Sequence, residues 1–159
     1  MKLEDFRQKY LLLQKKYDLP AFDEMNSAFD IGRIRRDSGN LLRDIRRTMV
    51  EKFVYYLKLV EVMINPSQAS PILLMLLKEI SSDDRKIIDS VLNSFVEIEI
   101  ASHVLDVHST ENDESKLITK IFDVWNKKKD EVLSIIKILE KNLKRKTPSP
   151  NKISRDYFN

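Results

Sequence analysis

One short interval gathers most of the side chains that could bind a metal ion. Both histidines of the 159-residue chain and three acidic residues fall within twelve positions: Glu97, Glu99, His103, Asp106 and His108. On a helix, Glu99 and His103 would share one face, and a metal ion could recruit Asp106 or His108 from a following loop. The same residue types are ordinary at a solvated helix end, and their spacing matches no recognised metal motif. A metal protein or enzyme centred on Glu99 and His103 is therefore the weaker alternative, and we expect no metal or cofactor.

Arginines are clustered in a way that could serve binding. Six of the ten arginines lie within fifteen residues: Arg33, Arg35, Arg36, Arg43, Arg46 and Arg47. In a helix that begins early enough, Arg36, Arg43 and Arg47 would be exposed together, opposite the apolar stripe. Such a set could contact phosphates of a nucleic acid or an acidic surface of a protein partner. Because acidic residues are interleaved with the arginines, a solvated helix face is the preferred interpretation.

The C-terminal segment combines basic and aromatic residues. Residues 141–159 carry six basic residues and one acidic residue, a net charge of +5, so the other 140 residues carry 22 basic and 24 acidic residues, a net charge of −2. Pro148 and Pro150 cannot continue a helix, and residues 146–159 are predicted to be a disordered tail. The free energy lost in ordering this tail on the chain's own body would exceed the free energy gained by burying its few apolar side chains. The tail residues expected to contact a partner are Lys144, Arg145, Lys146, Ile153, Tyr157 and Phe158.

Hydrophobic periodicity predicts that these residues are carried by an all-α fold. The spacing indicates a helix from about Leu3 to Asp18, a short helix after Pro20, and longer helices near residues 40–64, 83–102 and 111–144 that pack on one another. A nearly all-apolar segment, Ile72–Ile80, is expected to form a short, central, buried helix. The chain is thus a single bundle of five or six helices over residues 1–145, and the C-terminal turns of its long last helix should project or fray.

The least certain stretch in this pattern runs from residue 96 to residue 108. Its alternating apolar residues are typical of strands, so a hairpin competes with a helix that ends near Ser102 and leads into an extended loop. The predicted core consists of Ile45, Phe53, Tyr56, Val91, Phe95, Phe122 and Trp125.

Composition excludes several classes of protein. The chain has no cysteine, which removes disulfides, thiolate metal sites and cysteine nucleophiles. Its two glycines are too few for a phosphate-binding loop, and its longest apolar run, residues 71–77, is too short to span a membrane. No export signal is visible at the N-terminus, so a cytoplasmic location without a membrane partner is expected.

Two stretches carry a resemblance to known proteins. Residues 19–25 (LPAFDEM) and 41–49 (LLRDIRRTM), followed by Asn65-Pro66-Ser67, resemble segments of small all-helical archaeal proteins whose function is uncharacterised. The resemblance extends over residues 1–125 and leaves out the basic tail. It implies a helical fold but no activity, cofactor or site residue.

The interpretation that accounts for most of these features is a non-enzymatic, intracellular helical interaction protein. Its bundle would present a surface, and its last helix and tail would reach a protein partner. A nucleic-acid or ribonucleoprotein accessory factor, using the arginines between Arg33 and Arg47 together with the tail, is the alternative. The oligomeric state stays open.

Overall fold

The computed structural model describes residues 2–34, 39–77 and 80–146, and all regular structure in these ranges is helical. The all-α prediction is confirmed. The described ranges contain six α-helices: α1 (Leu3–Tyr17), α2 (Phe22–Phe29), α3 (Leu41–Ile64), α4 (Pro71–Leu77), α5 (Ser82–Val107) and α6 (Glu111–Lys146). Two short 3₁₀ turns, η1 (Ile31–Arg33) and η2 (Pro66–Gln68), follow α2 and α3. The predicted tail segment 147–159 and Arg36 lie outside the described residues.

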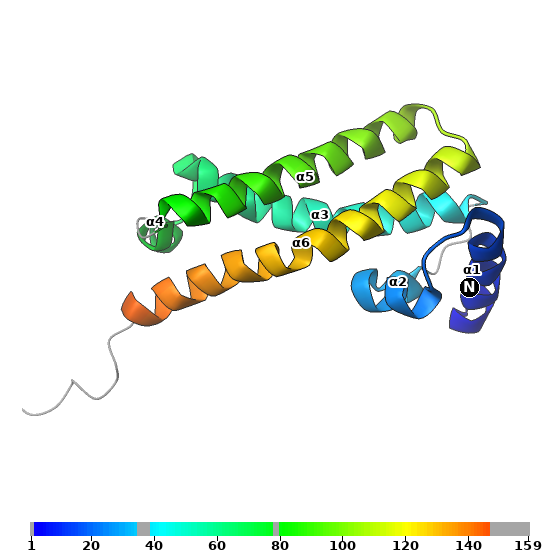
Figure 1. The fold of residues 1–159 in the computed structure, drawn as a ribbon, viewed down its shortest axis with the longest axis horizontal. Helices are drawn as coiled ribbons and strands as arrows, with labels where there is room; N and C mark the ends of the chain where they lie inside the picture. Colours follow the sequence, from blue (N-terminus) through cyan, green and yellow to red (C-terminus); the bar gives the residue numbers. More distant parts are fainter. Residues whose placement is uncertain (1, 35–38, 78–79, 147–159) are drawn as a thin grey trace, which may run out of the picture.

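Three long helices form the body of the molecule. Figure 1 shows α3, α5 and α6 side by side along its length, with α1 and α2 beside one end and α4 at the other. The last helix has 36 residues and is therefore about 54 Å long at 1.5 Å per residue. The prediction of a long C-terminal helix is confirmed, but its last turns do not simply project, because α4 packs on them and Asn142 is buried.

Local signals explain where the long helices begin. The Ser81 hydroxyl accepts from the backbone N–H of Asp84, whose carboxylate accepts from the N–H of Ser81, and the pair forms a capping box at α5. Thr110 and Asp113 make the same reciprocal bonds at α6. The predicted starts near residues 83 and 111 therefore agree with the structure to within a residue or two.

The predicted end of α5 is wrong. The helix continues past Ser102 to Val107, and residues 103–108 form neither an extended loop nor a hairpin. Its inner face carries the buried Ile98 and Ser102, whereas Ile100, Val104 and Val107 are exposed. A polar residue on the inner face and apolar residues on the outer face together produce the alternation that is typical of a strand.

The prediction of a central, buried α4 is also wrong. This helix lies at the end of the three-helix body (Figure 1), and Leu76 is its only buried residue. Asn65 and the turn η2 change the direction of the chain after α3. As a result α4 packs on α6 at the end of the body and is not enclosed between the long helices. One hydrogen bond links the backbone of α4 to the bundle: Asn142 Nδ2 of α6 donates to the Leu76 carbonyl oxygen at 3.0 Å.

Aromatic rings occupy the centre of the body. Phe53 of α3 is fully buried, and its ring centroid lies 4.4 Å from that of Phe95, 6.1 Å from Trp125 and 6.4 Å from Phe29. Five of the seven predicted core residues are buried, namely Ile45, Phe53, Val91, Phe95 and Trp125. Tyr56 and Phe122 are only partly buried and pack against the core from its edge.

We expect Phe53→Ala to lower the free energy of unfolding by about 3–5 kcal/mol, because it removes a ring that joins four helices and leaves a cavity. Urea denaturation followed by circular dichroism measures this change. Leu12→Ala, at a site 73% exposed, is the control and should change stability by less than about 0.5 kcal/mol. Equal effects of the two substitutions would contradict the central position of Phe53.

Candidate functional site

The most prominent polar cluster centres on a buried arginine of α3. The side chains of Arg46 and Glu114 are both 0% exposed, and Arg46 Nε lies 2.6 Å from Glu114 Oε2. Arg46 Nη1 donates to the carbonyl oxygen of Ser102 at 3.2 Å and to its hydroxyl, and Nη2 donates to Asp106 Oδ1 at 2.7 Å. One guanidinium therefore joins α3 to α5 and α6.

The charges in this cluster stabilise one another. Burial by itself would lower the pKa of Arg46, but the hydrogen bonds to Glu114 and Asp106 outweigh it and raise the pKa. The same hydrogen bond from Arg46, with a further one from Arg47, lowers the pKa of Asp106 although partial burial acts the other way. Arg46 and Asp106 therefore each favour the charged form of the other.

The clustered arginines that the structure describes form hydrogen bonds and ion pairs within the chain. Arg43 donates to the Ser109 hydroxyl at 3.1 Å, and Arg47 donates twice to Asp106 Oδ1, at 2.9 and 3.2 Å. Arg33 pairs with Glu51 at 2.6 Å. The described arginines of the cluster therefore contact acceptors of this chain, and Arg43 and Arg47 come together around the partners of Arg46.

Sequence reasoning did not single out Arg46 as the central member. Counted as one of the clustered arginines, it was not placed among the predicted contact residues. The sequence does indicate that Arg46 is buried, because it falls at the helical spacing of Leu42, Met49 and Phe53 on the inner face of α3. A charged residue in that register, with an acid on the inner face of another helix, is the signal for a buried ion pair.

The histidine and acidic residues near the end of α5 do not converge on one point. His103 Nε2 lies 3.8 Å from Glu99 Oε1, as the helical spacing predicts. Asp106 is bonded to the two arginines instead, and Glu97 pairs with Lys120. In the part of the chain that the structure describes, no three His, Asp or Glu side chains are grouped so that they could hold a metal ion.

The basic end of α6 is exposed. Lys144 pairs with Glu140 one turn away, Arg145 is exposed, and Lys146 is the last residue of the helix. Ile153, Tyr157 and Phe158, the other tail residues predicted to contact a partner, lie outside the described residues. The structure therefore places the basic residues Lys144 and Arg145 on the surface and leaves the role of the tail a prediction.

A hollow between α2, α3 and α6 contains a partly buried lysine, Lys52. Lys52 Nζ lies 3.9 Å from the ring centroid of Trp125 and donates to the Ala28 carbonyl oxygen near the end of α2. Burial lowers its pKa. The ammonium group already has two partners, so its contacts account for a structural role in holding α2 against α3 and α6.

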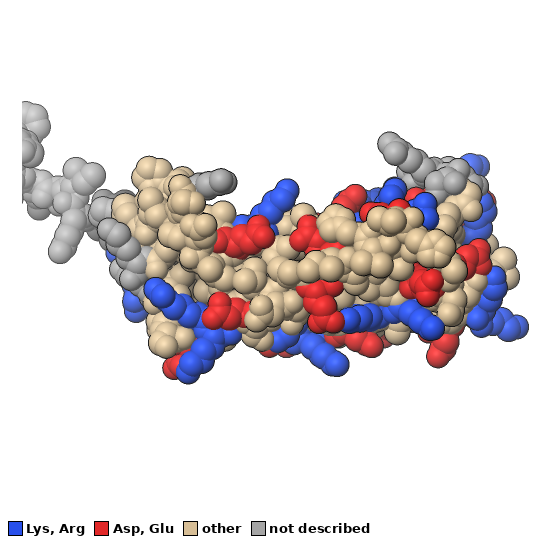
Figure 2. All heavy atoms as spheres, turned by 90° about the horizontal axis from the view of Figure 1, so that it is seen from above, with Lys and Arg blue, Asp and Glu red and all other residues tan. Residues whose placement is uncertain are grey.

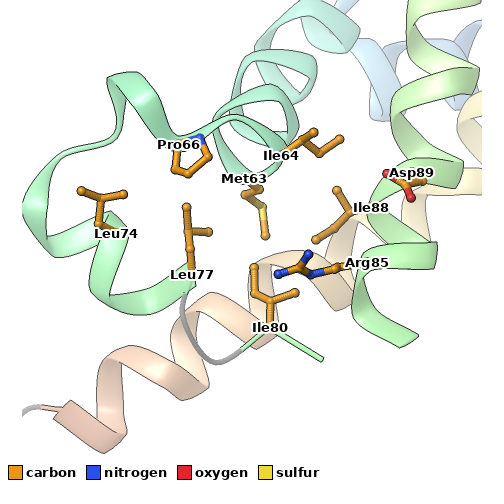
Figure 3. A pocket seen from close by; sticks show the side chains of 9 residues that line it. All are labelled: Met63, Ile64, Pro66, Leu74, Leu77, Ile80, Arg85, Ile88 and Asp89. Atoms are coloured by element: carbon orange, nitrogen blue, oxygen red, sulfur yellow. The ribbon is translucent and has the colours of Figure 1, made fainter. Parts of the chain in front are cut away.

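An apolar pocket and several exposed apolar side chains lie at the opposite end of the three-helix body from Arg46 and Glu114. A pocket of about 540 Å³ opens between α3, α4 and α5, and Figure 3 shows its lining: Met63, Ile64, Pro66, Leu74, Leu77, Ile80, Arg85, Ile88 and Asp89. Next to it α4 exposes 64% of Ile72, 38% of Leu74 and 46% of Met75, and α3 exposes 46% of Ile64. We refer to this pocket and these four side chains as the α4 surface.

The seven residues of α4 include no charged residue, whereas the neighbouring last turns of α6 carry several, among them Lys141, Lys144 and Arg145. In Figure 2 charged side chains flank an uncharged band along the visible face, and the end that carries α4 shows a broad uncharged area. Sequence reasoning missed this surface because a run of seven apolar residues was expected to be covered. The signal that could have revealed it is the pair Asn65-Pro66, which ends α3 just before the apolar run and forces a change of direction.

Comparison of the chain with protein-family models, with curated proteins and with solved structures finds no match. Among the described helices, none has the length and apolar character needed to cross a membrane. The functional argument therefore depends on the geometry of the arginine cluster and of the α4 surface.

We expect Arg46→Met and Glu114→Leu each to lower the free energy of unfolding by about 3–5 kcal/mol, because each removes the fully buried partner and leaves the other charge with only a more exposed one, Asp106 for Arg46 and Arg43 for Glu114. The double substitution removes both charges and should recover more than half of the loss of the worse single variant. Chemical denaturation of the four proteins as a double-mutant cycle measures the coupling. Additive losses would show that the two side chains do not interact across the bundle.

The ion pairs of Asp106 predict a dependence of stability on pH. Because its pKa is lowered in the folded chain, the stabilisation from Asp106 is fully present above the unfolded value of about 3.9 and is lost as pH falls through the folded value. The wild type should therefore be more stable than Asp106→Asn at pH 7, with a difference that narrows as pH is lowered from about 5 towards 2. Urea melts at several pH values test this, and a difference independent of pH would contradict it.

Proposed function

We propose that the chain is a non-enzymatic, intracellular helical interaction protein that binds a protein partner through the α4 surface. One observation carries the proposal: four large apolar side chains are exposed at one end of the bundle, where Ile64 and Leu74 line an apolar pocket and Ile72 and Met75 extend the apolar surface of α4. Exposed apolar groups gathered around a concavity are typical of surfaces that bind proteins. An intracellular location is supported by the absence of cysteine from the sequence.

The polar cluster supports a non-enzymatic role. Catalytic groups need polar atoms that are available to a substrate, usually in a cleft. Among the described residues, every buried side-chain nitrogen or oxygen atom has a hydrogen-bond partner. Arg46 and Glu114, the most deeply buried charges, satisfy each other and are closed off from solvent. We interpret this cluster as a structural link between helices.

The same contacts favour a protein partner over a nucleic acid. Arg33, Arg43 and Arg47 each contact an acceptor of this chain, so a phosphate would have to compete with these contacts. The exposed basic residues Lys144 and Arg145 on α6, with the segment that follows them, are proposed as a second contact. They add attraction to a partner with acidic groups.

The test is recovery of partners by the tagged full-length chain in cells of the organism that encodes it. Ile72→Glu should abolish recovery, because it places a charge in the contact, while a carboxylate in the first turn of α4 is compatible with the helix dipole. Leu12→Glu, an equally drastic change at an exposed site of α1, is the matched control and should leave recovery intact. Truncation after Arg145 should reduce recovery without changing the melting temperature.

Salt concentration separates the two classes of partner. Apolar docking should persist when salt is raised from about 0.1 to about 0.5 M, whereas contacts with phosphates weaken steeply over that range. Recovery that is lost in salt or after nuclease treatment, and that is unaffected by Ile72→Glu, would replace the protein-partner proposal by the nucleic-acid alternative.

A further inference from the structure

The α4 surface exposes apolar side chains to water when no partner covers it. The helix has seven residues, all of them apolar or proline, and only Leu76 is buried. A helix this short has little stability of its own in water and depends on packing. A partner made only under some conditions would leave Ile72, Leu74 and Met75 in water for the rest of the time. A second copy of the chain is the partner whose supply always matches that of the surface.

The shape of the surface is suited to pairing with itself. Each molecule carries exposed apolar side chains on α4 and a pocket of about 540 Å³; Leu74 lines this pocket, whereas Ile72 and Met75 lie outside its lining. In a two-fold symmetric contact the same patch is used by both molecules, so each projection of one copy must meet a recess of the other. A surface with only projections or only a recess would fit a partner of a different shape.

The charges at the pocket are self-complementary in the same sense. Arg85 and Asp89 line its α5 side and are exposed, and they lie one helical turn apart with the buried Ile88 near them (Figure 3). Two copies of α5 that meet in antiparallel orientation would place each arginine opposite an aspartate. Lining charges of a single sign would repel in such a pair, whereas this pair of opposite charges attracts.

We infer that the chain forms a two-fold symmetric dimer through the α4 surface, in which Arg85 of each protomer lies opposite Asp89 of the partner subunit. The inference rests on the proposed function, because it names the partner of the same surface. The dimer covers the exposed side chains of α4 and places apolar groups of each protomer in the pocket of the other.

Charge exchange tests this arrangement in the full-length chain. Sedimentation equilibrium of the wild type should give a dimer whose dissociation constant is weakened at least about tenfold, or about 1.4 kcal/mol, by Arg85→Glu and by Asp89→Arg, because each puts like charges face to face. The double variant should return to within about threefold of the wild type. An equimolar mixture of the two single variants should form a mixed dimer, because one carries two acids at the contact and the other two bases.

Lys86→Glu is the matched control. It makes the same change of charge at the next residue of α5, outside the pocket, and should leave the dissociation constant unchanged. Circular dichroism of each variant checks that it is folded. If one single variant fails to fold, the other single variant and the double variant are the measurements that decide.

Three results would overturn the inference. The first is a wild type that is monomeric up to about 100 µM, well above the micromolar range of a specific complex. The second is a dimer whose dissociation constant is changed by neither single charge substitution. The third is a dimer that is lost on truncation after Arg145. Failure of the proposed function is distinct. A monomeric chain that still recovers a different protein through Ile72 refutes the dimer alone, whereas a monomeric chain whose recovery does not depend on Ile72 refutes both.

Discussion

The ion pair between Arg46 and Glu114 is the constraint on which the arrangement of the three long helices depends. Both side chains are fully buried, and removing two charges from water is favourable only if their attraction and further hydrogen bonds offset the loss of hydration. Those further bonds come from α5, where Ser102 and Asp106 accept from the same guanidinium. A slide of any one helix along the others would leave a buried charge without its partner. We infer that the pair sets the register of α3, α5 and α6, which apolar contacts alone would leave less specific.

This constraint gives the molecule two unlike ends. Around the ion pair, Arg43, Arg47 and Ser109 extend the network to the turn between α5 and α6, so that the arginines contact acceptors within the chain. At the other end, α4 exposes apolar side chains to solvent, and the residues described there include no buried ion pair like that of Arg46 and Glu114. The first end determines how the helices fit together. The second end is where exposed apolar side chains lie at a pocket, and it is the end to which the proposed binding is assigned.

Much of this fold was predictable from local patterns, and the errors have a common origin. Capping residues such as Ser81 and Thr110 and the apolar stripe of α3 act within a few residues of the chain, so the helices and most of the aromatic core around Phe53 followed from spacing. The end of α5 and the role of Arg46 did not, because Ser102 and Arg46 are polar residues on inner faces. Their placement is favourable only through partners 56 to 68 residues away, which periodicity along one helix does not reveal.

The wrong prediction of a buried α4 also arises from a contact between residues far apart in the sequence. An apolar run is normally covered by its own chain, and that rule predicts a buried helix. Here Asn142, itself buried, donates to the carbonyl oxygen of Leu76 and fixes α4 on the last turns of α6. Because this bond is made to the backbone, it holds the helix in place without covering its other side chains. The exposed side chains of Ile72 and Leu74 are thus presented in a fixed arrangement, and a surface organised before binding loses less conformational freedom when a partner covers it.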